Sequence, residues 1–108
     1  MNYKIDENDG TVNIALPVRL YFDEAAVIRE AAMTLIDQGK LKFFFDFSNV
    51  AYIDSSGLSM LVALHRAVQG HGGKIAVEGL TGTVREIFRM TKLDKLFENE
   101  QQLERNEG

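Results

Sequence analysis

The feature that most restricts the fold of this chain is the alternation of strand-length apolar runs with helix-length amphipathic segments. The chain opens with two runs of period-two alternation, at residues 3–5 and 12–16, which are separated by an Asn-Asp-Gly turn signal at residues 8–10. Segments with helical periodicity and further apolar runs then follow in turn. Strands that alternate with helices predict a largely parallel sheet covered by helices, and therefore a fold of the α/β class.

Local signals define the later elements. Asp23 is expected to cap the first helix, with Phe22 and Val27 packed as a hydrophobic staple. The run at 41–47 is almost continuously apolar, which is typical of a central strand covered on both faces. A Thr-Val-Arg-Glu capping box at residues 83–86 is expected to open a third helix. The expected order is a helix from about Asp23 to Gln38, a strand at 41–47, a helix at 55–69, a strand at 74–78, a helix from 83 and a short helical segment around 93–97.

The size of the chain allows one domain. Its 108 residues can bury roughly two-thirds of the unfolded surface, which is enough for one core and too little for two. The expected domain spans residues 1–98. Residues 99–108 form a polar, acidic tail with one aliphatic side chain, which cannot bury anything.

Composition excludes several classes of function. The absence of cysteine excludes a disulfide scaffold, a thiolate zinc site and an iron–sulfur cluster, and it suits a cytoplasmic protein. A formal charge of −4 gives no electrostatic reason to expect nucleic acid binding. Because the longest apolar runs are strand-length, no direct insertion into a membrane is expected.

The most informative segment is the start of the helix at residues 55–69, where Asp54, Ser55 and Ser56 stand together. One side chain is enough to cap a helix, so a hydroxyl remains for another role. Catalysis is not expected, because no Gly-x-Ser-x-Gly elbow surrounds the serines. His65 lies about 13 Å further along the helix, beyond the reach of a general base.

Other chemical sites are equally poorly supported. His65 and His71 have no paired carboxylates and do not make a metal site, and no cofactor is expected. Asp46 ends a strand as the phospho-acceptor of a response-regulator receiver does. Leu-Pro-Val at residues 16–18 stands where a receiver needs an acidic pair, which argues against that interpretation.

The helix at residues 55–69 is apolar over more than one face, and two interpretations remain open. One stripe runs from Leu58 to Val68, and a second contains Met60 and Leu64. Full burial between the sheet and neighbouring helices explains both stripes. Alternatively, Met60 or Leu64 stays exposed near Ser56 as a protein-docking patch.

Residues 49–58, Asn-Val-Ala-Tyr-Ile-Asp-Ser-Ser-Gly-Leu, closely resemble the signature loop of STAS domains, specifically those of bacterial anti-sigma factor antagonists. The similarity continues through residues 73–80 and 84–97, and it covers about Ile5 to Phe97. The resemblance implies a small α/β fold with a mixed, mostly parallel sheet of four or five strands and about four helices.

The resemblance also implies a function as a phosphorylation-switched binding module. Family members bind an anti-sigma factor that is also a serine kinase with a histidine-kinase-like ATPase fold, and so release a sigma factor. The kinase phosphorylates the Asp-Ser-Ser-Gly loop, and a PP2C-type phosphatase removes the phosphate. In this chain the expected acceptor is Ser56 or, second, Ser55. The residues expected to contact the partner are Asp54, Ser55, Ser56, Gly57, Met60, Leu64, Arg19 and Asp23.

The chemistry of phosphoserine explains how such a site can switch. Phosphorylation adds roughly −1.5 to −2 charges. Free amides and the dipole at a helix N-terminus tolerate that charge, so the fold is expected to survive. When a partner protein is docked on the surface beside Asp54, the phosphate charge is repelled by that carboxylate and must be removed from water. Both effects weaken binding of the partner.

The segment at residues 16–23 departs from the family pattern and favours an alternative. The family commonly has Gly-Glu-Leu/Ile-Asp there, whereas this segment is about two residues longer and places Arg19 where an acid is usual, next to Ser56. The alternative is a STAS subunit that never cycles phosphate, as a scaffold of a signalling complex or an accessory subunit of a lipid-transport ABC system. Small-molecule sensing has only the apolar helix in its favour.

Overall fold

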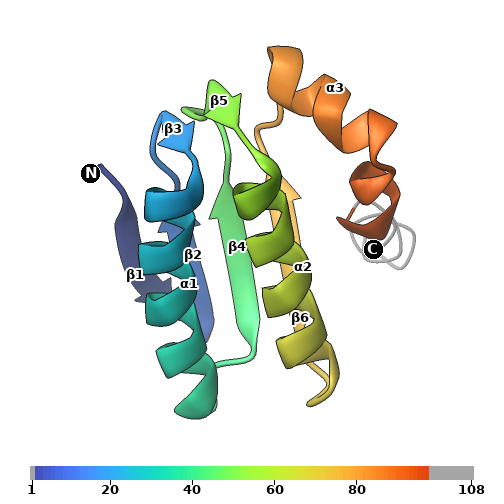
Figure 1. Cartoon of the computed structure of the whole chain (residues 1–108). Helices are drawn as coiled ribbons and strands as arrows, with labels where there is room; N and C mark the ends of the chain where they lie inside the picture. The colour runs from blue at the N-terminus through green and yellow to red at the C-terminus, as the bar shows by residue number, and fades with distance from the viewer. Residues whose placement is uncertain (1, 98–108) are drawn as a thin grey trace.

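The computed structural model describes residues 2–97 (Figure 1). The opening strand pair is a hairpin of β1 (Lys4–Asn8) and β2 (Thr11–Ala15), which run antiparallel. Asp9 and Gly10 connect them with φ angles of 52° and 80°. Two consecutive positive φ angles are the geometry of a type I′ turn, which matches the twist of the strands. The Asn-Asp-Gly signal is therefore confirmed as a hairpin turn.

The main sheet has four strands in the order β1-β2-β4-β6. The strands β4 (Lys42–Asp46) and β6 (Lys74–Glu78) pair in parallel with each other, and β2 is parallel to β4. Figure 1 shows α1 (Phe22–Asp37) and α2 (Ser55–Gln69) side by side in front of this sheet, with α3 (Gly82–Met90) to one side. Residues 93–97 are also helical. The predicted mixed, mostly parallel sheet with about four helices is confirmed.

A second, two-stranded parallel sheet was not predicted. It pairs β3 (Arg19–Leu20) with β5 (Tyr52–Ile53). Strands of two residues are too short to show a period in the sequence. The pairing ties the segment before α1 to the loop before α2, and so it determines which residues surround the start of α2.

The core lies between the helices and one face of the sheet. On β4, Phe43 and Phe45 belong to this core, whereas Phe44 between them is partly exposed. Side chains alternate between the two faces of a strand, so Phe44 lies on the face away from α1 and α2. The expectation that this strand is covered on both faces is wrong for the described residues.

The starts of two helices differ from prediction. Helix α1 begins at Phe22 after Tyr21, and the carboxylate of Glu24 accepts a hydrogen bond from the Tyr21 N–H at 3.0 Å. Asp23 is therefore inside the first turn and is not the cap. Phe22 is 67% exposed and Val27 is also exposed, so they form no staple. Helix α3 begins at Gly82, so the predicted capping box from residue 83 lies inside it.

Candidate functional site

The N-terminus of α2 is held by the side chain of Asp54. Its Oδ1 atom accepts hydrogen bonds from the N–H groups of Ser56 at 2.9 Å and Gly57 at 3.2 Å. This satisfies two donors that a helix start leaves without a partner inside the helix, and it confirms the predicted cap. Because Asp54 already uses these two amides, they are not free to receive a phosphate on a neighbouring serine.

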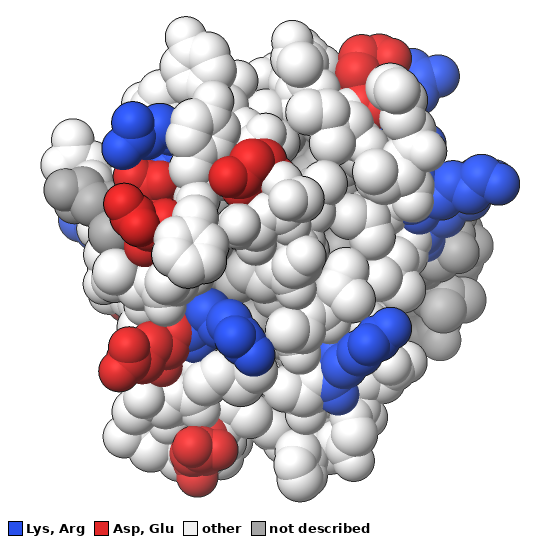
Figure 2. Space-filling model, in the orientation of Figure 1, with Lys and Arg blue, Asp and Glu red and all other residues white. Residues whose placement is uncertain are grey.

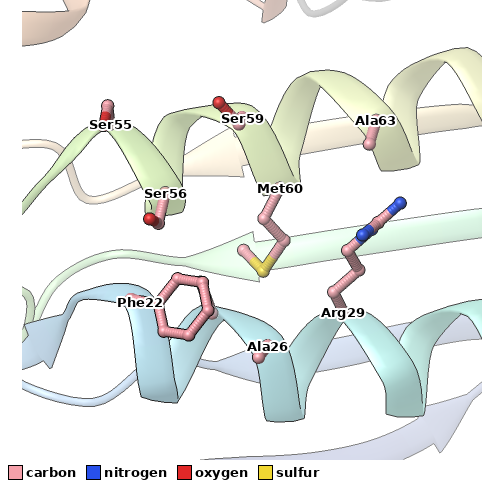
Figure 3. Close-up of a pocket in the computed structure, with 9 residues that line it drawn as sticks. Phe22, Ala26, Arg29, Ser55, Ser56, Ser59, Met60 and Ala63 are labelled. Carbon is pink, nitrogen blue, oxygen red and sulfur yellow. The ribbon is translucent and has the colours of Figure 1, made fainter.

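The two candidate serines point in different directions. Figure 3 shows the Ser56 hydroxyl directed toward α1 and the ring of Phe22, and the Ser55 side chain on the side of α2 that is farther from α1. Ser55 is exposed and Ser56 is partly exposed. Both hydroxyls are therefore within reach of another macromolecule.

Ser56 opens onto a groove of about 360 Å³ between α1 and α2. The groove is mainly apolar, with Phe22 near the serines and Arg29 further along α1 (Figure 3). Ser59 follows one turn after the two serines on α2. The residues that line the groove are Phe22, Ala25, Ala26, Arg29, Ser55, Ser56, Ser59, Met60 and Ala63.

Gly57 fixes how closely α2 approaches the small sheet. A Cβ atom at this position would lie 2.8 Å from the backbone oxygen of Leu20 and 2.8 Å from Cγ1 of Ile53. Leu20 and Ile53 are paired across β3 and β5. The glycine therefore lets the first turn of α2, with its serines, pack directly against this sheet.

Four large, exposed apolar side chains lie within four residues of the start of α1 or α2. We call them the apolar rim: Val18, Tyr21, Phe22 and Tyr52. Phe22 is 67% exposed and Tyr52 is 57% exposed. The carbonyl of Val18 accepts the Tyr52 N–H at 3.1 Å, which brings the two segments together. Figure 2 shows a mostly uncharged surface over the starts of α1 and α2, interrupted by single acidic and basic side chains. Exposed apolar side chains that gather next to a polar site are typical of protein-binding surfaces.

The exposed docking patch proposed for Met60 and Leu64 is wrong. Met60 is 2% exposed and Leu64 is 1% exposed, and both belong to the core cluster. The apolar stripes of α2 are explained by burial against α1 and the sheet. Met60 still lines the floor of the groove beside Ser56, whereas the exposed apolar surface comes from the rim.

Arg19 forms an ion pair within the molecule, and its side chain remains exposed. Its Nη2 atom lies 2.9 Å from Oε2 of Glu24, and its guanidinium lies 5.6 Å from the ring centre of Tyr21. Arg19 is not among the residues that line the groove of Ser56, where the arginine is Arg29. Asp23 is exposed on the first turn of α1, next to Phe22.

The carboxylate of Glu24, on α1, binds both the Tyr21 N–H and the guanidinium of Arg19. The hydrogen bond from Arg19 and, second, that from the Tyr21 N–H hold the pKa of Glu24 below its ordinary value of 4.5. The same contact raises the pKa of Arg19. The ionised carboxylate thus fixes Tyr21 and the start of α1 in one arrangement.

Replacing Glu24 with glutamine is expected to lower the free energy of unfolding at neutral pH. A group with a lowered pKa stabilises the fold fully above its ordinary value of 4.5, and this stabilisation is lost as the pH falls through the lowered pKa. Urea unfolding across a pH series should therefore show a difference between wild type and Glu24→Gln that disappears in acid. Glu30→Gln, on the exposed side of α1, is the control and should change little at any pH. A Glu24 effect that persists unchanged in acid would contradict this account.

His65 and Asp46, which were also considered as candidate residues, make contacts of other kinds. His65 is buried on α2, with its ring centre 5.6 Å from that of Phe97 in an edge-to-face contact. Asp46 accepts a hydrogen bond from the Ser48 N–H at 2.9 Å. Among residues 2–97, no cluster of three or more histidine, aspartate or glutamate side chains is placed to hold a metal ion. No helix in the same range is both long and apolar enough to cross a membrane.

Comparisons with known proteins identify the family. The family model of the STAS domain matches residues 2–107. The chain is 32% identical over 102 residues to the anti-sigma-B factor antagonist of Bacillus subtilis (strain 168), covering 91% of each protein.

Solved structures share the fold at lower identity. The anti-sigma factor antagonist SpoIIAA in its unphosphorylated form superposes with a TM-score of 0.73 at 23% identity, covering 82% of each chain. SpoIIAA from Bacillus in the phosphorylated form gives 0.75 at 23% identity, covering 87% of this chain and 86% of that one. A putative anti-sigma factor antagonist from Thermotoga maritima gives 0.79 at 23% identity, covering 86% and 80%. Together with the family match over almost the whole sequence, these likenesses show that the chain belongs to the STAS domain family.

Proposed function

We propose that this protein is an anti-sigma factor antagonist: a non-catalytic module that binds an anti-sigma factor and is released from it by phosphorylation of the Asp-Ser-Ser-Gly loop. The observation that carries the proposal is the accessible pair of serines beside the apolar rim. A reachable hydroxyl at the edge of an uncharged surface can control binding to that surface. The 32% identity to an anti-sigma-B factor antagonist supports the same role.

Ser56 is the preferred acceptor because of where its hydroxyl points. It opens onto the groove beside Phe22, so a partner that packs on the rim and groove covers it (Figure 3). A phosphate there adds roughly −1.5 to −2 charges to a surface that docking would desolvate. Asp54 occupies the amides of Ser56 and Gly57, so the phosphate adds its charge beside an existing carboxylate. The expected result is loss of binding with the fold retained.

The proposed partners follow from this switch. The anti-sigma factor is a serine kinase with a histidine-kinase-like ATPase fold, which binds the unmodified protein and transfers phosphate from ATP to Ser56. A PP2C-type phosphatase restores the hydroxyl, and the cycle takes place in the cytoplasm. Asp23 on the first turn of α1 and Asp54 at the start of α2 supply acidic contacts at the edge of the rim.

The test is phosphorylation by a kinase-type anti-sigma factor from the same genome, with ATP and Mg²⁺, followed by peptide mass spectrometry. One phosphate is expected on Ser56, and it should disappear in Ser56→Ala. Ser59→Ala is the matched control, since Ser59 lines the same groove one turn later, and it should be phosphorylated like wild type. Finding no phosphate on Ser55 or Ser56 would contradict the switch. Retained binding with no phosphate would instead support the non-phosphorylated scaffold.

The structure weakens one argument for that scaffold. Arg19 stands where the family usually has an acid, but it is paired with Glu24 at 2.9 Å. Its charge is therefore largely balanced within the molecule. The altered segment still presents Tyr21 and Phe22 on the rim, and these side chains are expected to determine which anti-sigma factor is bound.

A further inference from the structure

Helix α2 has a second groove, on the side that faces the segment after α3. This second groove has a volume of about 490 Å³ and is mainly apolar. Ser55, Ser59 and Ala63 line both this groove and the groove of Ser56, so the two grooves form one continuous surface on either side of α2. The residues that line the second groove are Ser55, Leu58, Ser59, Val62, Ala63, Arg66, Thr91 and Leu93.

Each groove contains one arginine. Arg29 of α1 lines the groove of Ser56, and Arg66 of α2 lines the second groove. Both side chains are exposed, and in the part of the chain that the structure describes neither forms an ion pair or a side-chain hydrogen bond. Figure 2 shows basic side chains over the middle of α1 and α2, below the mostly uncharged surface at the starts of these helices. Both arginines are therefore available to a binding partner.

No acidic side chain lines either groove. Helix α2 contains no aspartate or glutamate, and the carboxylate of Asp54 lies about 18 Å before Arg66 along its axis. On α1, Glu30 follows Arg29 but lines a separate depression together with Tyr3. Asp37 lies about 12 Å beyond Arg29, at the end of α1. The surface over the two grooves is thus basic at the end away from the serines.

The arginines are placed for a ligand that also covers the serines. Arg29 lies about 10.5 Å beyond Phe22 along α1, and Arg66 lies about 16.5 Å beyond Ser55 along α2. A partner helix of about three turns spans that distance. Such a helix reaches from the apolar rim to both arginines, with the short side chains of Ser59 and Ala63 beneath it. Helices that bind in grooves present apolar side chains at helical spacing and polar side chains at the edges.

We propose that the anti-sigma factor places an acidic amphipathic helix along α2, with apolar side chains in the two grooves and carboxylates paired with Arg29 and Arg66. The inference rests on the proposed function, because the grooves continue the surface around Ser56. A carboxylate can accept two parallel hydrogen bonds from a guanidinium, so the pairing fixes the position of the helix as well as its charge. The two arginines would thereby select the partner, whereas Ser56 controls whether that partner stays bound.

The first test is isothermal titration calorimetry with the kinase-type anti-sigma factor from the same genome. Arg29→Glu and Arg66→Glu should each weaken binding about tenfold, and the double variant about 100-fold, because the two sites are separate. Arg29→Lys keeps the charge and should bind within about threefold of wild type. Lys42→Glu is the matched control: it makes the same change in charge on the opposite face of the sheet, and it should bind like wild type. Added salt should weaken binding of wild type more than binding of the double variant.

Cross-linking identifies the partner's carboxylates directly. A carbodiimide joins a lysine amine to a carboxylate in contact with it, so Arg29→Lys and Arg66→Lys should each give a new cross-link to an aspartate or glutamate of the anti-sigma factor. Wild type should lack both products. Reversal variants that bind and are phosphorylated on Ser56 like wild type would overturn this inference alone, whereas an anti-sigma factor that fails to bind wild type would overturn the proposed function with it. Reversal variants that bind more tightly would also overturn it, because another acidic segment, such as residues 98–108 of this chain, would then occupy the grooves.

Discussion

Gly57→Ala is expected to lower the free energy of unfolding by about 2–3 kcal/mol. The added methyl group would lie 2.8 Å from the backbone oxygen of Leu20 and 2.8 Å from Cγ1 of Ile53. Ile53 can partly adjust its side chain, but the carbonyl of Leu20 belongs to the β3–β5 pairing and moves only with the strand. Accommodation therefore requires α2 to shift away from the small sheet. Urea unfolding followed by circular dichroism measures the change in stability.

Gly70→Ala provides the matched control for this prediction. Gly70 ends the same helix with φ −61°, and a Cβ atom there would lie no closer than 3.7 Å to its neighbours. Alanine at such a position should leave stability unchanged or raise it by up to about 1 kcal/mol, because it restricts the unfolded chain. Equal effects of the two substitutions would show that close packing at Gly57 does not hold the serine loop in place.

Phosphorylation of Ser56 is expected to weaken binding to the anti-sigma factor by at least about 100-fold, which corresponds to roughly 2.8 kcal/mol. The phosphate would bring its charge into the groove beside Phe22 and close to Asp54, where docking excludes water. Ser56→Asp carries only one charge and a shorter side chain, so its effect should be smaller, about tenfold. Ser56→Ala should bind as wild type does. Isothermal titration calorimetry with the purified anti-sigma factor measures all three.

Position-matched controls separate charge at Ser56 from charge anywhere on the surface. Ser59→Asp adds the same charge to the same groove one turn further on and should weaken binding less than Ser56→Asp. Added salt should reduce the Ser56→Asp effect, because part of it is electrostatic. Phe22→Ser should weaken binding by removing an exposed ring from the rim without emptying the core. If Ser56→Asp bound as tightly as Ser56→Ala, the proposed interface would be in the wrong place.

Much of the fold could be predicted because its signals are local. The bounds of α2 and β6 match the predicted residues 55–69 and 74–78, and the Asn-Asp-Gly signal is the hairpin turn. The cap of α2 was also predictable, since Asp54 reaches amides only two and three residues away. In each case the residues that interact are close neighbours in the chain.

Most of the errors concern contacts between distant segments. The stripes of α2 allowed either burial or exposure of Met60 and Leu64, and their burial follows from packing against other elements. One error is local: Phe22 was expected to pack as a staple after a cap at Asp23, but Glu24 bonds the N–H of Tyr21, which caps the helix two residues earlier, and the ring of Phe22 is exposed. Arg29 gave no signal in the sequence, because it reaches the serines' groove only through the packing of α1 beside α2.

The order of strands and helices, the capped serine loop and the likeness to STAS domains could all be read from the amino-acid sequence. Three features required the packed chain: the exposure of Phe22 and Tyr52 near the serines, the pairing of Arg19 with Glu24, and the direction of Phe44 away from the helices. Periodicity and capping depend on neighbours in the chain, whereas the exposure of a side chain depends on which distant segments cover it. The same apolar run, Lys-Phe-Phe-Phe-Asp, suits a strand covered on two faces or on one, and the placement of α1 and α2 on a single face selects between them.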